Sequence, residues 1–177
     1  MIKKTKFVTF PRSGHHLLMR GLQWALQDEL VYSEGYKSPH NMDKCPCVNI
    51  QKTHDFDLSE PVLPEMNYIV QIRPFELAVE SWHKLEPSGM EFEEFRDSKV
   101  KYFDDFMAKW VLTNLPNVTV IPYNELVSDK VGTLLKAYKA ITDLPLEPHR
   151  LDAIRKWERA EITKKCVIFA DSNIQSA

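Results

Sequence analysis

The sequence predicts a three-layer α/β fold, in which a mostly parallel sheet carries helices on both faces. Short β-branched and aromatic runs alternate with longer stretches of helical periodicity along the 177 residues. No repeat, low-complexity stretch or linker divides the sequence, so we expect a single domain over residues 1–177. Arg12 and Arg73 each follow an apolar run, which is where a parallel sheet binds its ligands.

Apolar runs are expected to form the strands at residues 6–10, 48–53, 67–73 and 117–122. The run at 67–73 has the strongest strand pattern of these. Residues 32–47 contain several glycines, prolines and asparagines and are expected to be a loop. Residues 57–65 are expected to be a loop or a short helix, and the tail at 166–169 could add an edge strand.

Helical periodicity predicts helices at residues 14–27, 74–85, 91–114, 129–142 and 149–161. Ser128 is a plausible N-cap for the fourth of these. In the second, one face is expected to carry Leu77, Ala78, Ser81, Trp82 and Leu85. The aromatic stripe of the third helix is assigned to the core and not to a cofactor site.

The composition excludes several classes of protein. The formal net charge of −2 argues against a general nucleic-acid binder, which is usually basic. No apolar run approaches the roughly 20 residues that span a bilayer. The basic residues 1–6 lead straight into a strand pattern, so we do not expect them to be a signal peptide. Three cysteines, an odd number, do not suggest a disulfide framework. We therefore expect a cytoplasmic protein without a membrane span.

A candidate anion-binding loop occupies residues 9–18, Thr-Phe-Pro-Arg-Ser-Gly-His-His-Leu-Leu. A strand that turns through a glycine into a helix directs the positive end of the helix dipole at one place. Arg12 adds a full charge, so the loop suits phosphate or sulfate. An ordinary turn with a surface arginine is the alternative. The loop is not a Walker A motif, since His15 and His16 stand where Lys and Ser/Thr would be.

Four segments together resemble the sulfotransferases that use 3′-phosphoadenosine 5′-phosphosulfate (PAPS). Residues 11–17 resemble the 5′-phosphosulfate loop of that family, Pro-Lys/Arg-Ser-Gly-Thr-Thr. Residues 71–81 resemble its 3′-phosphate segment, in which a strand-ending Arg is followed eight residues later by Ser. Residues 51–54 are similar to its Lys-Thr-His stretch, and residues 121–126 to its Tyr-Glu-Asp-Leu stretch. The resemblance implies a fold like that of P-loop NTPases.

The resemblance also implies the residues that bind PAPS. Its 5′ end would be bound by Arg12, Ser13, Gly14, His15 and His16. Arg73 and Ser81 would bind the 3′-phosphate, for which a planar guanidinium and a hydroxyl are well suited. Tyr123 would lie near the adenine.

The implied reaction moves a sulfuryl group from PAPS to an acceptor hydroxyl. His54 would be the general base, and Arg12 and Lys52 would stabilise the leaving phosphate. No metal is required. The acceptor, a small molecule or a carbohydrate, is not identified by the sequence. Residues 32–47 and 87–95 are expected to face it.

Several features depart from the family pattern. His15 and His16 replace the paired threonines, and either of them could be the base instead of His54. Glu80 is a further candidate for that role, since some branches of the family use a carboxylate. Leu17 stands where many members have an adenine-stacking Trp. The late Arg-Lys-Gly segment has no clear counterpart, and the basic residues between 150 and 165 are expected to form a solvated face.

Three alternatives remain open. His40, Cys45, Cys47 and His54 could bind zinc, although Cys-Pro-Cys is tighter than the usual spacing of ligands. The chain could be a kinase-like P-loop phosphotransferase acting on a nucleotide or a sugar. It could also be a non-catalytic module that binds a nucleotide or a partner on the same fold.

Overall fold

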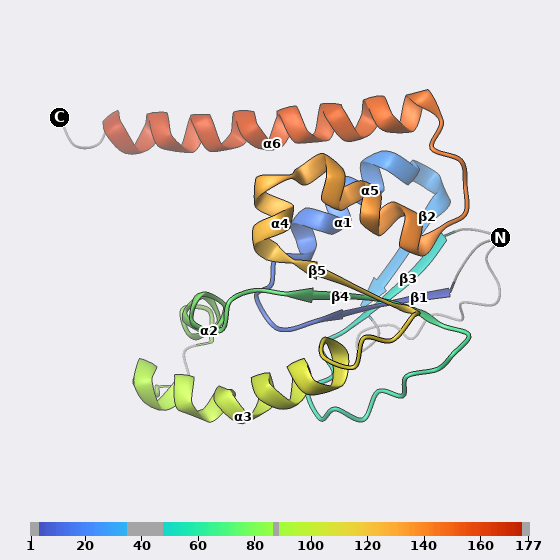
Figure 1. Cartoon of the computed structure of the whole chain (residues 1–177). Coiled ribbons are helices and arrows are strands. Elements are labelled where there is room, and N and C mark those ends of the chain that lie inside the picture. The colour runs from blue at the N-terminus through green and yellow to red at the C-terminus, as the bar shows by residue number, and fades with distance from the viewer. Residues whose placement is uncertain (1–3, 35–47, 87–88, 175–177) are drawn as a thin grey trace.

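Five parallel strands form the central sheet in the part of the protein that the computed structural model describes, residues 4–34, 48–86 and 89–174. The strands follow the order β2-β3-β1-β4-β5, so the first strand lies in the middle (Figure 1). Their bounds are β1 Lys4–Thr9, β2 Leu30–Glu34, β3 Val48–Thr53, β4 Asn67–Ile72 and β5 Val118–Pro122. All neighbouring strands pair in parallel, and the predicted α/β sheet is confirmed.

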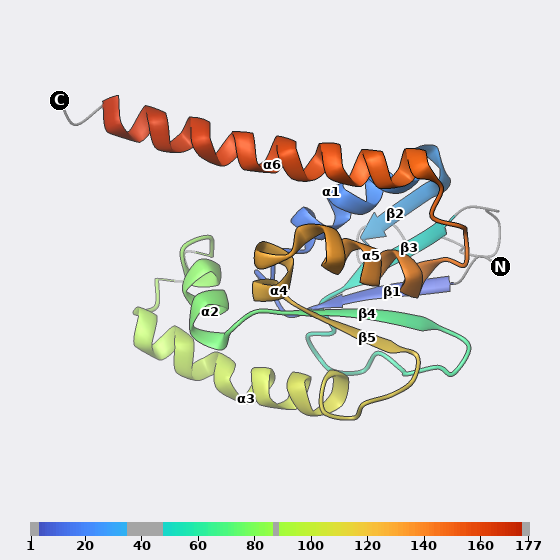
Figure 2. The same cartoon turned by 45° about the horizontal axis from the view of Figure 1, so that its top comes forward.

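Helices cover both faces of this sheet (Figures 1 and 2). The helices are α1 His15–Leu26, α2 Phe75–His83, α3 Phe92–Trp110, α4 Tyr123–Ser128, α5 Lys130–Ile141 and α6 Pro148–Ile174, with a 3-10 turn at Gln27–Glu29. α1, α4 and α5 lie on one face, and α2 and α3 lie on the other. α6 packs against α1 and α5 on their outer side.

The core is divided by the sheet because successive strand residues point to opposite faces. Phe7 of β1 packs with α1, α5 and α6, and the next residue, Val8, packs with α2 and α3. In the register of the sheet, Val8 lies opposite Thr53 and Thr9 lies opposite Gln71. The carboxyl ends of β1, β3 and β4 are therefore level with one another, and the residues that follow them meet at one edge.

Two predictions about strands are wrong. Residues 30–34 form the edge strand β2 against β3, although the sequence predicts a loop from residue 32. The glycine and prolines that indicate the loop begin only at residue 35, and pairing with β3 decides the conformation before that point. Residues 166–169 belong to α6, although their apolar pattern suggests a strand. Short apolar runs fit either state, and the continuing helix decides here.

The amino end of α5 is capped by Asp129 and not by Ser128. The Asp129 carboxylate accepts a hydrogen bond of 2.8 Å from the N–H of Gly132. Ser128 instead ends α4, a helix that the sequence analysis does not predict. Both residues are good N-caps, and α4 moves the start of α5 by one residue.

The buried side of α2 is rotated from the predicted one. Ala78 and Val79 are buried against the sheet, whereas Leu77 and Leu85 are exposed. Ser81 is half-buried, and its side of the helix faces the cavity described next.

Candidate active site

A cavity of about 530 Å³ lies at the carboxyl edge of the sheet. Its described lining comes from the segments that follow β1, β3 and β4 and from the helices α1, α2 and α4: Pro11, Arg12, Gly14, His15, His16, Lys52, His54, Phe56, Arg73, Ser81, Trp82 and Tyr123. The structure thus brings together every predicted site residue except Ser13, which is buried beside the cavity in the same loop. Among the described lining residues there are three cations and no carboxylate.

The loop between β1 and α1 requires a glycine at position 14. Gly14 has φ +83°, in the region that favours glycine, and it directly precedes α1. A Cβ atom on Gly14 would lie 2.6 Å from the ring of Tyr123. Gly14, His15 and His16 at the amino end of α1 line the cavity, so the positive end of the helix dipole, which no described side chain caps, faces it.

The two predicted anion-binding arginines lie in this one cavity and are linked to each other. Arg12 Nε donates to the hydroxyl of Ser81 at 3.1 Å. Arg73 donates to the carbonyl oxygen of Arg12 at 3.5 Å, and its guanidinium lies 4.7 Å above the ring centre of Tyr123. Ser81, which is predicted to share the 3′-phosphate with Arg73, is thus bonded to Arg12 in this structure.

The imidazole of His54 is held by the end of β1. Its Nδ1 lies 2.8 Å from the carbonyl oxygen of Thr9 and 3.0 Å from the Thr9 hydroxyl. A carbonyl oxygen can only accept, so Nδ1 carries a proton and donates it. In the neutral ring Nε2 then bears the lone pair, which is the tautomer a general base needs at that nitrogen.

Two further imidazoles and a lysine lie near His54. The ring of His15 is 3.9 Å from that of His16 and 6.2 Å from that of His54, measured between ring centres. Lys52 is only 3% exposed although it lines the cavity. A charge removed from water interacts strongly with an opposite charge, so the ammonium group of Lys52 favours an anion in the cavity.

Two aromatic side chains that the sequence analysis does not assign to the site complete the wall near His54. Phe56 is 60% exposed, and its ring centre lies 5.1 Å from that of His54. Trp82 of α2 lies 6.0 Å from Phe56, measured between ring centres. The position of Phe56, two residues after His54, is the signal that could have pointed to it.

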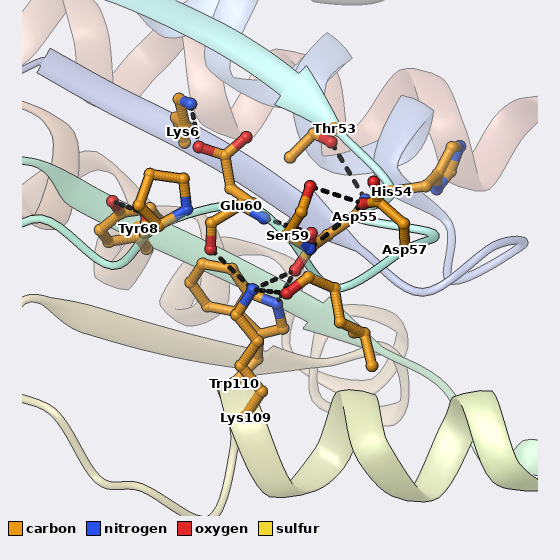
Figure 3. A network of polar contacts seen from close by, with 12 residues as sticks. Lys6, Thr53, His54, Asp55, Asp57, Ser59, Glu60, Tyr68, Lys109 and Trp110 are labelled. Atoms are coloured by element: carbon orange, nitrogen blue, oxygen red, sulfur yellow. Dashed lines mark hydrogen bonds and ion pairs between the residues drawn. The ribbon is translucent and has the colours of Figure 1, made fainter.

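The segment after His54 is fixed to α3 by a polar network that the sequence analysis also misses (Figure 3). Asp55 is 4% exposed and has φ +49°. Its Oδ2 accepts hydrogen bonds from Lys109 at 2.7 Å and from the indole of Trp110 at 2.8 Å. Its Oδ1 accepts from the N–H of Glu60 at 2.8 Å. The partners of Asp55 on α3 are more than 50 residues away in sequence, beyond the reach of any local pattern.

Two buried polar side chains lie next to the loop. The hydroxyl of Ser13 and both amide atoms of Gln71 have no hydrogen-bond partner within the described residues. Gln71 is near the loop, since its Nε2 would lie 3.8 Å from a Cβ on Gly14. Burying such a group without a partner costs about 1–3 kcal/mol, which a ligand at this edge could offset.

Comparison with known proteins identifies the fold. No family model matches the sequence, and a search of curated proteins finds no match. Among solved structures, that of mouse sulfotransferase SULT7A1 complexed with PAP superimposes with a TM-score of 0.69 at 15% sequence identity. The chain has a sulfotransferase fold. The alignment covers 90% of this chain and 66% of that one, and the resemblance inferred from four short segments is confirmed at the level of the fold.

Some residues that the sequence analysis considers lie outside the cavity. Glu80 does not appear in the described lining and forms an ion pair with Lys84 at 2.6 Å. The hydrogen bond and the charge of Lys84 hold the pKa of the Glu80 carboxyl below its ordinary value. Leu17 packs against the core. No described residue of α6 lines the cavity.

The basic residues at the start of α6 do not all form the solvated face that the sequence predicts. Arg150 is buried, donating to the carbonyl oxygen of Ala25 at 3.2 Å and to the carboxylate of Glu29 at 2.6 Å. Arg155 and Lys156 are exposed, as expected.

The proposed zinc ligands cannot be compared as a set. His40, Cys45 and Cys47 lie outside the described residues, and His54 is described. Within the described ranges no group of three or more His, Cys, Asp or Glu side chains could hold a metal ion. None of the helices, over the residues described, has the length and apolar character needed to cross a membrane.

Proposed function

We propose that this chain is a sulfotransferase that moves a sulfuryl group from PAPS to an acceptor hydroxyl. The observation that carries the proposal is the gathering of Arg12, Lys52, Arg73 and the amino end of α1 around one cavity that also contains His54. A donor with a phosphosulfate and a 3′-phosphate needs several cations in one place. The likeness of the fold to that of a sulfotransferase complexed with PAP supports this proposal.

In this proposal the loop and the two arginines bind the donor. Arg12 and the first turn of α1, with Ser13 to His16, bind the phosphosulfate. Arg73 and Ser81 bind the 3′-phosphate, and Tyr123, already beneath Arg73, contacts the adenosine end. The Arg12–Ser81 hydrogen bond of 3.1 Å joins the two anion sites, so one connected group of side chains binds both ends of the donor.

The transfer step uses His54 and two cations. The acceptor oxygen attacks sulfur, the bond from sulfur to the 5′-phosphate oxygen breaks, and 3′-phosphoadenosine 5′-phosphate (PAP) leaves. Nε2 of His54 takes the proton of the acceptor hydroxyl while Nδ1 keeps its bond to Thr9. Arg12 and Lys52 stabilise the negative charge that develops on the leaving phosphate.

A second cavity is the proposed entrance for the acceptor, a small molecule or a carbohydrate. It measures about 620 Å³, and its described lining comes from the segment between Thr53 and Glu60. His54 and Phe56 border both cavities, so an acceptor in the second one would reach the proposed base. We propose that the reaction takes place in the cytoplasm and requires no metal.

Calorimetric titration with PAP, followed by transfer from radiolabelled PAPS to sugars and phenols, tests this function. We expect PAP to bind without Mg²⁺ and label to appear on at least one hydroxyl compound. Stronger binding of Mg-ATP than of PAP would favour the phosphotransferase. Binding of PAP without transfer to any acceptor would favour the non-catalytic module.

A further inference from the structure

The ammonium group of Lys109 on α3 forms three hydrogen bonds to the segment that follows His54. Its ammonium group donates to Asp55 Oδ2 at 2.7 Å, to the carbonyl oxygen of Leu58 at 2.8 Å and to that of Glu60 at 2.6 Å. These three bonds use all three donors of the group. Figure 3 shows Lys109 and Trp110 reaching from α3 to Asp55.

A second residue of α3 holds His54 itself. The hydroxyl of Tyr102 donates to the backbone carbonyl oxygen of His54 at 2.6 Å. The Tyr102 ring stacks on Phe10, the residue after β1, at 5.3 Å between ring centres. Burial first, and then the charge of Asp55, raise the pKa of the Tyr102 phenol, so it keeps its proton and donates at neutral pH.

The backbone of His54 lies just beyond the paired part of the sheet, and only its ring is bonded to β1. The register between β1 and β3 ends at the pair Val8 and Thr53, one residue before His54. The next residue, Asp55, has the left-handed φ of +49°, where the chain leaves the strand direction. The backbone of His54 is therefore fixed by contacts from outside the sheet, such as the bond from Tyr102.

We propose that Tyr102 and Lys109 are positioning residues for His54. Tyr102 holds the carbonyl of His54, and Lys109, acting through Asp55, holds the turn that follows. With these two points fixed, the ring stays bonded to the carbonyl oxygen of Thr9. The inference rests on the proposed function, in which His54 is the base.

This arrangement separates the placing of the base from the binding of the donor. Arg12, Arg73 and Ser81 belong to segments after β1 and β4 and to α2, and none of them has a described contact with Tyr102 or Lys109. Loss of the contacts from α3 should therefore lower kcat and leave the affinity for PAP unchanged. A general loss of structure would lower both.

The test compares Tyr102→Phe and Lys109→Met with Lys101→Met in the full chain. Lys101 also lies on α3, but it pairs with Asp105 on the exposed side of the helix, which makes it a matched control. We expect Tyr102→Phe and Lys109→Met to lower kcat about tenfold or more, because a small misplacement of a catalytic group has effects of this order. The dissociation constant of PAP should stay the same, and Lys101→Met should change neither quantity.

A spectroscopic measurement tests the position of His54 without activity. With labelled histidine, NMR detects the Nδ1 proton that donates to Thr9, and its loss in His54→Gln assigns the signal. We expect the signal in the wild type and in Lys101→Met, and its loss in Tyr102→Phe and Lys109→Met. Tyr102→Phe removes a single oxygen atom, so it gives an answer even where Lys109→Met does not fold.

The outcomes separate the two proposals. An unchanged Nδ1 signal with unchanged kcat in both variants would overturn the positioning role, and so would equal losses of kcat and PAP affinity. Wild-type protein that neither binds PAP nor transfers sulfate would overturn the proposed function. In that case the Nδ1 signal alone decides whether α3 positions His54.

Discussion

The ring of Tyr123 lies against the backbone of Gly14, closer than any side chain at position 14 would allow. Tyr123 opens α4 after β5, and Gly14 precedes α1 after β1. β4 separates these two strands in the sheet, so the contact spans the carboxyl edge from one side of β4 to the other. The loop between β1 and α1 is thereby supported by a segment more than 100 residues away.

Gly14→Ala should damage the loop for two separable reasons. The positive φ alone costs a residue with a Cβ about 1–3 kcal/mol, and the collision with Tyr123 adds to this. Gly89→Ala is the control, since Gly89 has φ +69° and open space where the Cβ would be. We expect Gly14→Ala to lower the melting temperature more than Gly89→Ala and to be the only one that weakens binding of PAP. Equal effects of both changes would show that the contact with Tyr123 is unimportant.

Arg12→Ala and Arg73→Ala should each weaken the binding of PAP by about 1–3 kcal/mol, because each removes charge-assisted hydrogen bonds to an anion. Calorimetric titration measures the change. Arg96→Ala on α3, whose guanidinium pairs with Glu93 and Asp97, is a suitable control and should bind PAP as the wild type does. Unchanged affinity in both site variants would refute the assignment of the cavity.

His54→Gln should lower the transfer rate, whereas Glu80→Gln should not. Removing a general base lowers the rate by roughly 10²–10⁴-fold, so we expect a loss of this order for His54→Gln. Glu80 is exposed and paired with Lys84, and its replacement should leave the rate unchanged. Parallel measurements on His15→Gln and His16→Gln complete the series. A greater loss in one of these variants would move the role of the base to that histidine.

The raised pKa of Tyr102 predicts a loss of stability at alkaline pH. Burial disfavours the phenolate in the folded state, so the stabilisation is present below the ordinary phenol pKa of about 10 and is lost as the pH rises above it. Denaturant unfolding from neutral to alkaline pH should show a smaller decline for Tyr102→Phe than for the wild type. The pKa values of Tyr68 and Tyr138 are also raised, but these residues are present in both proteins, so their contributions cancel. Equal declines would contradict the prediction.

Local patterns were enough to predict four of the five strands and the edge of the sheet at which the candidate site residues meet. Period-two and helical stretches give the alternation of strands and helices, and parallel strands bring their carboxyl ends to one edge. Arg12, His54 and Arg73 each follow a strand, and the structure gathers them around one cavity. Their roles with PAPS, the cytoplasmic location and the single domain stay predictions.

Contacts between distant residues were beyond the reach of those patterns. The bond of Asp55 to Lys109 depends on how α3 lies across the loop after β3, which no local signal gives. The buried side of α2 was misjudged for a similar reason, since Leu77 and Ala78 fit a helical stripe equally well. Packing against the sheet buries Ala78 and Val79 and leaves Leu77 exposed.

The bond between His54 and the carbonyl oxygen of Thr9 is the same in both charge states of the imidazole. A carbonyl oxygen accepts from Nδ1 whether or not Nε2 holds a proton. In the proposed reaction, the ring can therefore gain and release a proton at Nε2 without turning, and a new cycle can begin from the orientation in which the last one ended.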